Sequence, residues 1–108
     1  MAGAVPPGPS FPSVDIHVHL HPDGLARAIE RWFAQRGWPA GHSFDPAGVA
    51  DTLRSRGVRR FCFFSYAHKP GMSRALNRWL SEQAARLSEA VALGTLHPDD
   101  PDLDEIAR

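Results

Sequence analysis

The sequence predicts an α/β fold in which a small parallel sheet alternates with helices. Three short segments have the alternation or the apolar character of strands, and the segments between them have helical periodicity. Strands that are separated by helices usually pair in parallel through right-handed crossovers. The strands are expected at 14–20, 58–65 and 91–96, and the helices at about 25–36, 46–56 and 73–89, with a further helix beginning at 103.

The chain is expected to begin with a disordered lead-in, residues 1–13, followed by one ordered domain at 14–108. The lead-in contains four prolines and two glycines, a composition with few hydrogen-bond donors and little capacity to build a core. In the strand at 14–20, apolar and polar residues alternate strictly, which is the period of a strand. Its apolar side is expected to face the core, and its polar side carries an aspartate and two histidines.

The two helices that follow have identifiable ends. Gly37 is a plausible stop for the first, and Asp45 followed by Pro46 has the pattern of an N-cap and a first-turn proline for the second. Four apolar residues form one stripe along the first helix at positions i, i+4, i+7 and i+8: Leu25, Ile29, Trp32 and Phe33.

The second strand, 58–65, is apolar apart from Arg59 and Arg60, so it is expected to be buried on both faces, as strands of a parallel sheet are. A closed (β/α)8 barrel needs about 250 residues, so three strands in 108 residues do not close one. The alternatives are a small open α/β sheet or an incomplete barrel. The helix-like segment that begins at 103 favours the incomplete barrel.

Composition excludes several partner classes. Twelve basic residues balance twelve acidic ones, so no net charge attracts nucleic acid or an anionic membrane. The single cysteine, Cys62, is expected to be a buried thiol. The N-terminus lacks the features of a secretory signal, and no segment has the roughly 20 apolar residues that span a bilayer. These observations predict a cytoplasmic protein whose partners are neither nucleic acid nor membrane.

The pair His17 and His19 is the strongest chemical signal. Residues i and i+2 share one face of a strand, and two imidazoles at that spacing can converge on one metal ion. Both lie near the carboxyl end of their strand, where barrel enzymes build their sites. We expect this face to point into an enclosed interior, with Asp15 deeper as an acceptor that orients a ligand. The alternative is that the polar residues form a solvent face.

The segment Asp15-Ile16-His17-Val18-His19-Leu20 resembles the opening D-x-H-x-H strand of the amidohydrolase superfamily. It is most similar to the amidohydrolase-related branch that includes aminocarboxymuconate semialdehyde decarboxylase-like proteins. The resemblance continues in Gly57-Val58-Arg59-Arg60-Phe61, in Asn77 and in the segment from Val91 to Asp100, and thus covers about 14–108.

This resemblance implies the N-terminal part of a (β/α)8 TIM barrel with a mononuclear divalent metal, usually zinc. The implied reaction is attack of a metal-activated water on a carbonyl-type centre of a small-molecule substrate, or a related non-oxidative decarboxylation by a carboxy-lyase. Only His17 and His19 match the metal ligands of the family. The ligands on the fifth and eighth strands and the catalytic histidine on the sixth have no counterpart here, so we assign no catalytic residue and expect an incomplete fragment.

Three further residues are candidates for substrate binding because they lie at the carboxyl rim of the expected strands. His21 and His97 each follow a strand and precede a proline, and Lys69 lies in the loop after the second strand. The alternative interpretation is that each of the three is a loop residue that does not bind substrate.

Two other functions remain open. A polymerase-and-histidinol-phosphatase-type metallophosphoesterase also begins with an H-x-H strand, and Asp23-Gly24 is similar to the turn that follows it. A non-catalytic interaction module is the other possibility. In that case the partner is a second copy of the chain, in a homo-oligomer, or a complementary barrel fragment.

Overall fold

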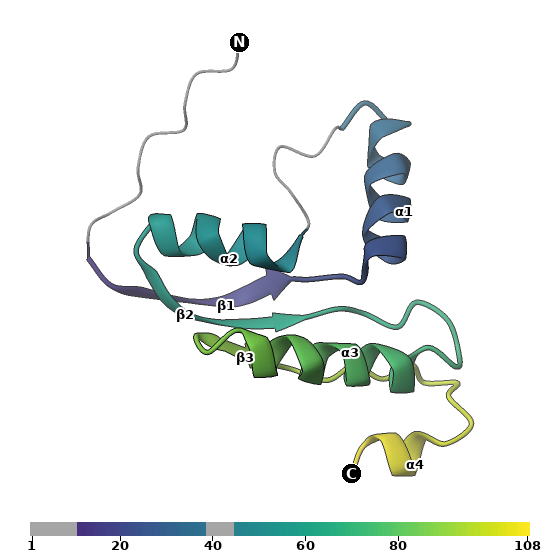
Figure 1. Ribbon diagram of the computed structural model, residues 1–108. Coiled ribbons are helices and arrows are strands. Elements are labelled where there is room, and N and C mark those ends of the chain that lie inside the picture. The colour runs from purple at the N-terminus through teal and green to yellow at the C-terminus, as the bar shows by residue number, and fades with distance from the viewer. Residues whose placement is uncertain (1–10, 39–44) are drawn as a thin grey trace.

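The computed structural model describes residues 11–38 and 45–108, so the predicted lead-in lies outside the described residues over 1–10 (Figure 1). The three strands form one sheet in the order β1-β2-β3, and both neighbouring pairs are parallel. This confirms the α/β class with a three-stranded parallel sheet. The elements are β1 (Ser13–His19), α1 (Asp23–Ala34), α2 (Pro46–Ser55), β2 (Val58–Phe64), α3 (Ser73–Arg86), β3 (Ala90–Ala92) and α4 (Leu103–Ile106).

Helix α1 begins two residues before the predicted start and ends as its sequence indicates. The Ala26 N–H donates to the Pro22 carbonyl at 2.8 Å, so the helix begins directly after that proline. At the other end, the Gly37 N–H donates to Ala34 and the Trp38 N–H to Phe33. This is a Schellman motif, with Gly37 at φ +76 in the left-handed region that glycine adopts most readily.

The second helix, α2, has the predicted cap. The Asp45 carboxylate accepts a hydrogen bond of 3.0 Å from the Gly48 N–H, and Pro46 occupies the first turn. Its last turn leads through Gly57, at φ +84, into β2. The Gly57 carbonyl then accepts the Ser13 N–H at 3.0 Å, which ties the start of β1 to the start of β2.

Strand β3 is shorter than the predicted 91–96. The Leu93 N–H still donates to the Phe63 carbonyl, but the backbone of Thr95 pairs with a side chain instead of a strand. The Asn77 amide in α3 accepts the Thr95 N–H at 2.8 Å and donates to the Thr95 carbonyl at 3.0 Å. Since one amide occupies both backbone groups, the chain leaves the sheet at this point.

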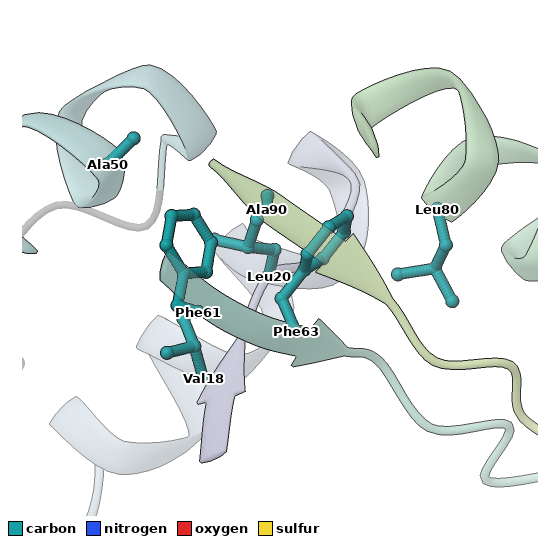
Figure 2. Packing of buried hydrophobic residues seen from close by; sticks show 7 residues of the cluster. All are labelled: Val18, Leu20, Ala50, Phe61, Phe63, Leu80 and Ala90. Carbon is teal, nitrogen blue, oxygen red and sulfur yellow. The ribbon is translucent and has the colours of Figure 1, made fainter. Parts of the chain in front are cut away.

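One face of the sheet is covered by helices and forms the core. Phe61 and Phe63 of β2 project to this face, Phe61 on the side of Ala50 in α2 and Phe63 on the side of Leu80 in α3 (Figure 2). Both phenylalanines are at most 1% exposed. The buried cluster is Val18, Leu20, Ala50, Phe61, Phe63, Leu80 and Ala90.

The opposite face has no helix against it among the described residues. The prediction that β2 is buried on both faces is therefore wrong. On this face Phe64 and Cys62 are only half-buried, and Val91, which pairs with Cys62 across the β2–β3 register, is 41% exposed. Both α2 and α3 pack on the same side of the sheet. The apolar pattern of residues 58–65 therefore identified a strand, but it did not reveal how many faces of that strand are covered. We call this surface the open face, defined by Cys62, Phe64, Val91 and Leu93.

The loops that follow β2 and β3 are joined at the carboxyl edge of the sheet. The buried Asp100 carboxylate accepts hydrogen bonds of 2.8 Å from the backbone N–H groups of Gly71 and His97, and another from the Ser73 hydroxyl. The Ala67 N–H donates to the Thr95 hydroxyl at 3.1 Å. These bonds hold the two loops together next to the end of β1.

None of the helices in the described part of the chain is both long and apolar enough to cross a bilayer.

Candidate metal centre

The rings of His17 and His19 converge at the carboxyl end of β1. Their Nε2 atoms are 3.2 Å apart, and their ring centroids are 5.0 Å apart. At this distance the Nε2–H of one ring donates a hydrogen bond to the Nε2 of the other, an arrangement available to neutral imidazoles. The two side chains therefore lie on the same side of the sheet, as their spacing predicts.

The separation of the two nitrogens suits a shared ion. Two nitrogens bound tetrahedrally to zinc at about 2.0–2.1 Å lie about 3.3–3.4 Å apart, close to the observed 3.2 Å. Metal binding also requires the neutral imidazole. Partial burial, followed by the neighbouring His17 charge, lowers the pKa of His19 from its ordinary value of 6.5, which favours this form at neutral pH.

The expectation of an enclosed site is wrong. His17 and His19 are both exposed, because they lie on the side of the sheet that no helix covers. Across residues 11–38 and 45–108, no group of three or more His, Cys, Asp or Glu side chains is placed to hold a metal ion. The described residues of one chain thus offer two ligands to an ion.

The predicted orienting residue, Asp15, acts on the backbone. Its carboxylate accepts the His17 N–H at 2.9 Å, within β1 itself. The register between β1 and β2 is irregular here, because Asp15 pairs with Phe61 whereas Val18 pairs with Phe63. The carboxylate stabilises this irregular part of the strand and so helps to set the direction of the His17 side chain.

Aromatic residues of β2 and its loop pack against the histidine rings. The Phe64 ring makes edge contacts with His17 and His19, at centroid distances of 5.1 and 4.6 Å, and the Tyr66 ring lies 5.8 Å from His19. Sequence reasoning missed both aromatic residues. Their position at the carboxyl end of the strand next to β1 was the available signal, because parallel strands end at the same edge of a sheet.

His21, a predicted substrate-binding residue, lies behind His19. It is only 3% exposed, and its Nδ1 atom is 2.8 Å from the Ser65 hydroxyl oxygen. Its ring stacks on His19 at 5.8 Å and meets Tyr66 at 5.3 Å. Burial, followed by the charge of His19, lowers the pKa of His21 to about 4, so its imidazole is neutral at neutral pH. His21 thus belongs to the wall that supports the histidine pair.

The other two predicted substrate-binding residues lie in the loops at the same edge of the sheet. Lys69 is exposed in the loop after β2. His97 is half-buried after β3, where its Nδ1 accepts the Asp99 N–H at 3.1 Å. The contacts of His97 are thus within its own loop, whereas His17, His19 and His21 form one row.

A cavity of about 460 Å³ lies beside this row. Its lining is mostly apolar and comes from α1, including Leu25, Ile29 and Trp32, and from Tyr66 and His68 of the loop after β2. Because Tyr66 also contacts His19 and His21, the cavity adjoins the wall of the candidate site.

Comparison with known proteins identifies no relative: no protein-family model, no curated protein and no solved structure matches this chain.

Proposed function

We propose that this chain carries the first two metal ligands, His17 and His19, of a metal-dependent hydrolase or a related carboxy-lyase of the amidohydrolase type. We expect a divalent metal ion at this site, and zinc is the first candidate for its identity. The observation that supports the proposal is the approach of the two Nε2 atoms to 3.2 Å at the carboxyl end of a parallel strand. The assignment to the amidohydrolase type and to its barrel depends on the D-x-H-x-H resemblance.

The chemistry follows from what an ion supplies in such a place. When bound, it lowers the pKa of a coordinated water toward neutrality and polarises a substrate oxygen. The residues of the chain hold the ligands: Phe64 packs against both rings, and His21 with Ser65 supports His19. The apolar cavity beside Tyr66 is a site for the apolar part of a small-molecule substrate. A cytoplasmic location is part of this proposal.

The test is zinc binding by the metal-free chain, measured by competition with a chromophoric chelator. We expect His17→Ala and His19→Ala each to weaken zinc binding by about tenfold or more, which is a loss of about 1.4 kcal/mol. His68→Ala, at an exposed histidine in the loop after β2, is the matched control and should bind as the unmodified chain does. Cys62→Ala tests whether the thiol contributes.

Two results would overturn the proposal. One is equal zinc affinity in the unmodified chain and in both strand variants. The other is a loss of binding in Cys62→Ala or His68→Ala while both strand variants keep the affinity of the unmodified chain, because zinc would then be held elsewhere. Circular dichroism of each variant establishes that the fold is kept.

A further inference from the structure

We propose that Tyr66 determines substrate specificity at the candidate site, because the cavity beside it selects substrates with an uncharged apolar group next to the reacting carbonyl. This inference depends on the metal binding proposed above and adds the class of substrate. It does not depend on how many further ligands the ion takes, because it uses only the lining of the cavity and its contact with the histidine row.

Tyr66 is the residue that the cavity and the histidine row have in common. Its ring meets the rings of His21 and His19 edge-on, at interplanar angles of 79° and 86°. The same residue lines the cavity. Tyr66 is 43% exposed, so a bound molecule can contact its ring. A group that fills the cavity next to Tyr66 therefore lies one side chain away from His19.

The size and the lining of the cavity define the group that it can hold. Its volume of about 460 Å³ is within the range of about 300–1,000 Å³ that is typical of small-molecule sites. Its described lining contains no Asp, Glu, Lys or Arg: five residues of α1 are apolar, and the other two are Tyr66 and His68. A charge placed there would lose hydration without gaining an opposite charge. The cavity therefore favours an uncharged apolar group.

Contacts of Trp32 hold the α1 side of the cavity in place. The Arg36 guanidinium lies 3.7 Å from the centre of the Trp32 ring, and its Nη1 donates a hydrogen bond of 3.0 Å to the Trp32 carbonyl. The Phe33 ring meets the Trp32 ring edge-on at a centroid distance of 5.0 Å. A wall that is already ordered reduces the cost of binding an apolar group.

The experiment compares zinc-binding probes that share one metal-binding head. Acetohydroxamate carries a methyl group on its carbonyl, and benzohydroxamate carries a phenyl group. Each is titrated by calorimetry into the chain loaded with one equivalent of zinc. We expect benzohydroxamate to bind at least about tenfold more tightly, because its phenyl group is buried in the cavity. With a charge added in 4-carboxybenzohydroxamate, this gain should be lost.

Two alanines of α1 provide matched variants. Ala28 lines the cavity and Ala34 does not, and both are exposed. Ala28→Leu fills the cavity and should reduce the ratio of the two affinities toward one, whereas Ala34→Leu should keep it. Tyr66→Ala should also reduce the ratio, and Tyr66→Phe, which retains the ring, should restore it. Circular dichroism establishes that each variant is folded, and the alanine pair decides if Tyr66→Ala is not.

The results separate this inference from the proposed function. Zinc-dependent binding of both probes with equal affinity would overturn the role of the cavity and of Tyr66, but would leave the metal site intact. An equal gain from the phenyl group in Ala28→Leu and Ala34→Leu, or an undiminished gain with 4-carboxybenzohydroxamate, would do the same. If neither probe binds in a zinc-dependent way, the proposed metal site and the inference are both wrong.

Discussion

Phe63 and Phe64 are neighbours in β2 with different roles, because successive side chains of a strand point to opposite faces. Phe63 is fully buried against the helices. Phe64 is half-buried on the open face, where it contacts the rings of His17 and His19. The first phenylalanine is therefore expected to contribute mainly to stability, and the second mainly to the position of the histidines.

This difference can be measured. Phe63→Ala should lower the free energy of unfolding by about 3–5 kcal/mol, the usual cost of truncating a fully buried phenylalanine. Phe64→Ala should cost half of that or less, because solvent already reaches its ring. Urea unfolding of both variants checks the prediction. Equal losses of stability would contradict the one-sided core.

The residues of the candidate site were predictable to different degrees. The spacing of His17 and His19 was enough to place both rings together, because the two share a strand. The sequence did not indicate that His21 is buried, because its partner Ser65 lies 44 positions away and meets it only through the pairing of β1 with β2. The sequence also did not indicate that the Asp15 carboxylate accepts the His17 N–H, because this bond lies where the register between β1 and β2 is irregular.

At the scale of elements, the two ends of α1 offer a matched pair of glycines. Gly24 lies in the first turn and Gly37 follows the last turn at φ +76. A Cβ added at either position meets no heavy atom within 4 Å, so packing is the same in both cases. What differs is the backbone conformation that each position requires.

We therefore expect Gly37→Ala to destabilise the protein by about 1–2 kcal/mol, the cost of a left-handed conformation for an alanine. Gly24→Ala should be neutral or stabilise by up to about 1 kcal/mol, because alanine favours the helix and restricts the unfolded chain. Thermal unfolding measured by circular dichroism gives both values. A destabilisation of similar size at both positions would show that the φ angle at 37 is not the cause.

Element ends were predictable where a local signal determines them. Gly37 closes α1 and Asp45 caps α2 through contacts within a few residues, so both could be anticipated. The end of β3 was not predictable in this way, because Asn77 on α3 takes the backbone groups of Thr95. A pattern within residues 91–96 contains no information about a side chain 18 positions earlier.

For the whole molecule, the parallel pairing of the strands followed from the alternation of strands and helices. The enclosed site did not, because the number of covered faces depends on how the elements are arranged in space. The helices cover one face, and the histidine pair lies on the other. The same arrangement that exposes the candidate ligands leaves Val91 and Leu93 exposed beside them.

The stability of the whole molecule at acid pH is expected to depend on Asp100. Its carboxylate joins the loops that follow β2 and β3 at the carboxyl edge of the sheet. The Ser73 hydroxyl, followed by the N–H groups of Gly71 and His97, lowers the pKa of Asp100 below its ordinary value of 3.8. A carboxyl whose pKa is lower in the folded state stabilises that state above the ordinary value, and this contribution is lost as the pH falls through the lowered value.

Asp100→Asn should therefore be less stable than the unmodified chain at pH 7, and the difference should shrink below about pH 4 as the carboxylate of the unmodified chain takes up a proton. Urea unfolding at pH 7 and at about pH 3 tests this. Asp99→Asn, at the exposed neighbouring position, is the control and should show no such pattern. A stability difference for Asp100→Asn that is independent of pH would argue against the charged carboxylate as the cause.

The amide of Asn77 also affects whether a strand of another molecule can pair with the outer edge of β3. An edge strand with free backbone groups is a template on which another chain can add a strand, and long edges of this kind promote aggregation. Both backbone groups of Thr95 are already occupied by Asn77, and β3 itself has only three residues. A strand from a neighbouring molecule can therefore form only a few backbone hydrogen bonds along this edge. The small number of bonds protects the sheet from growing into a fibril in that direction.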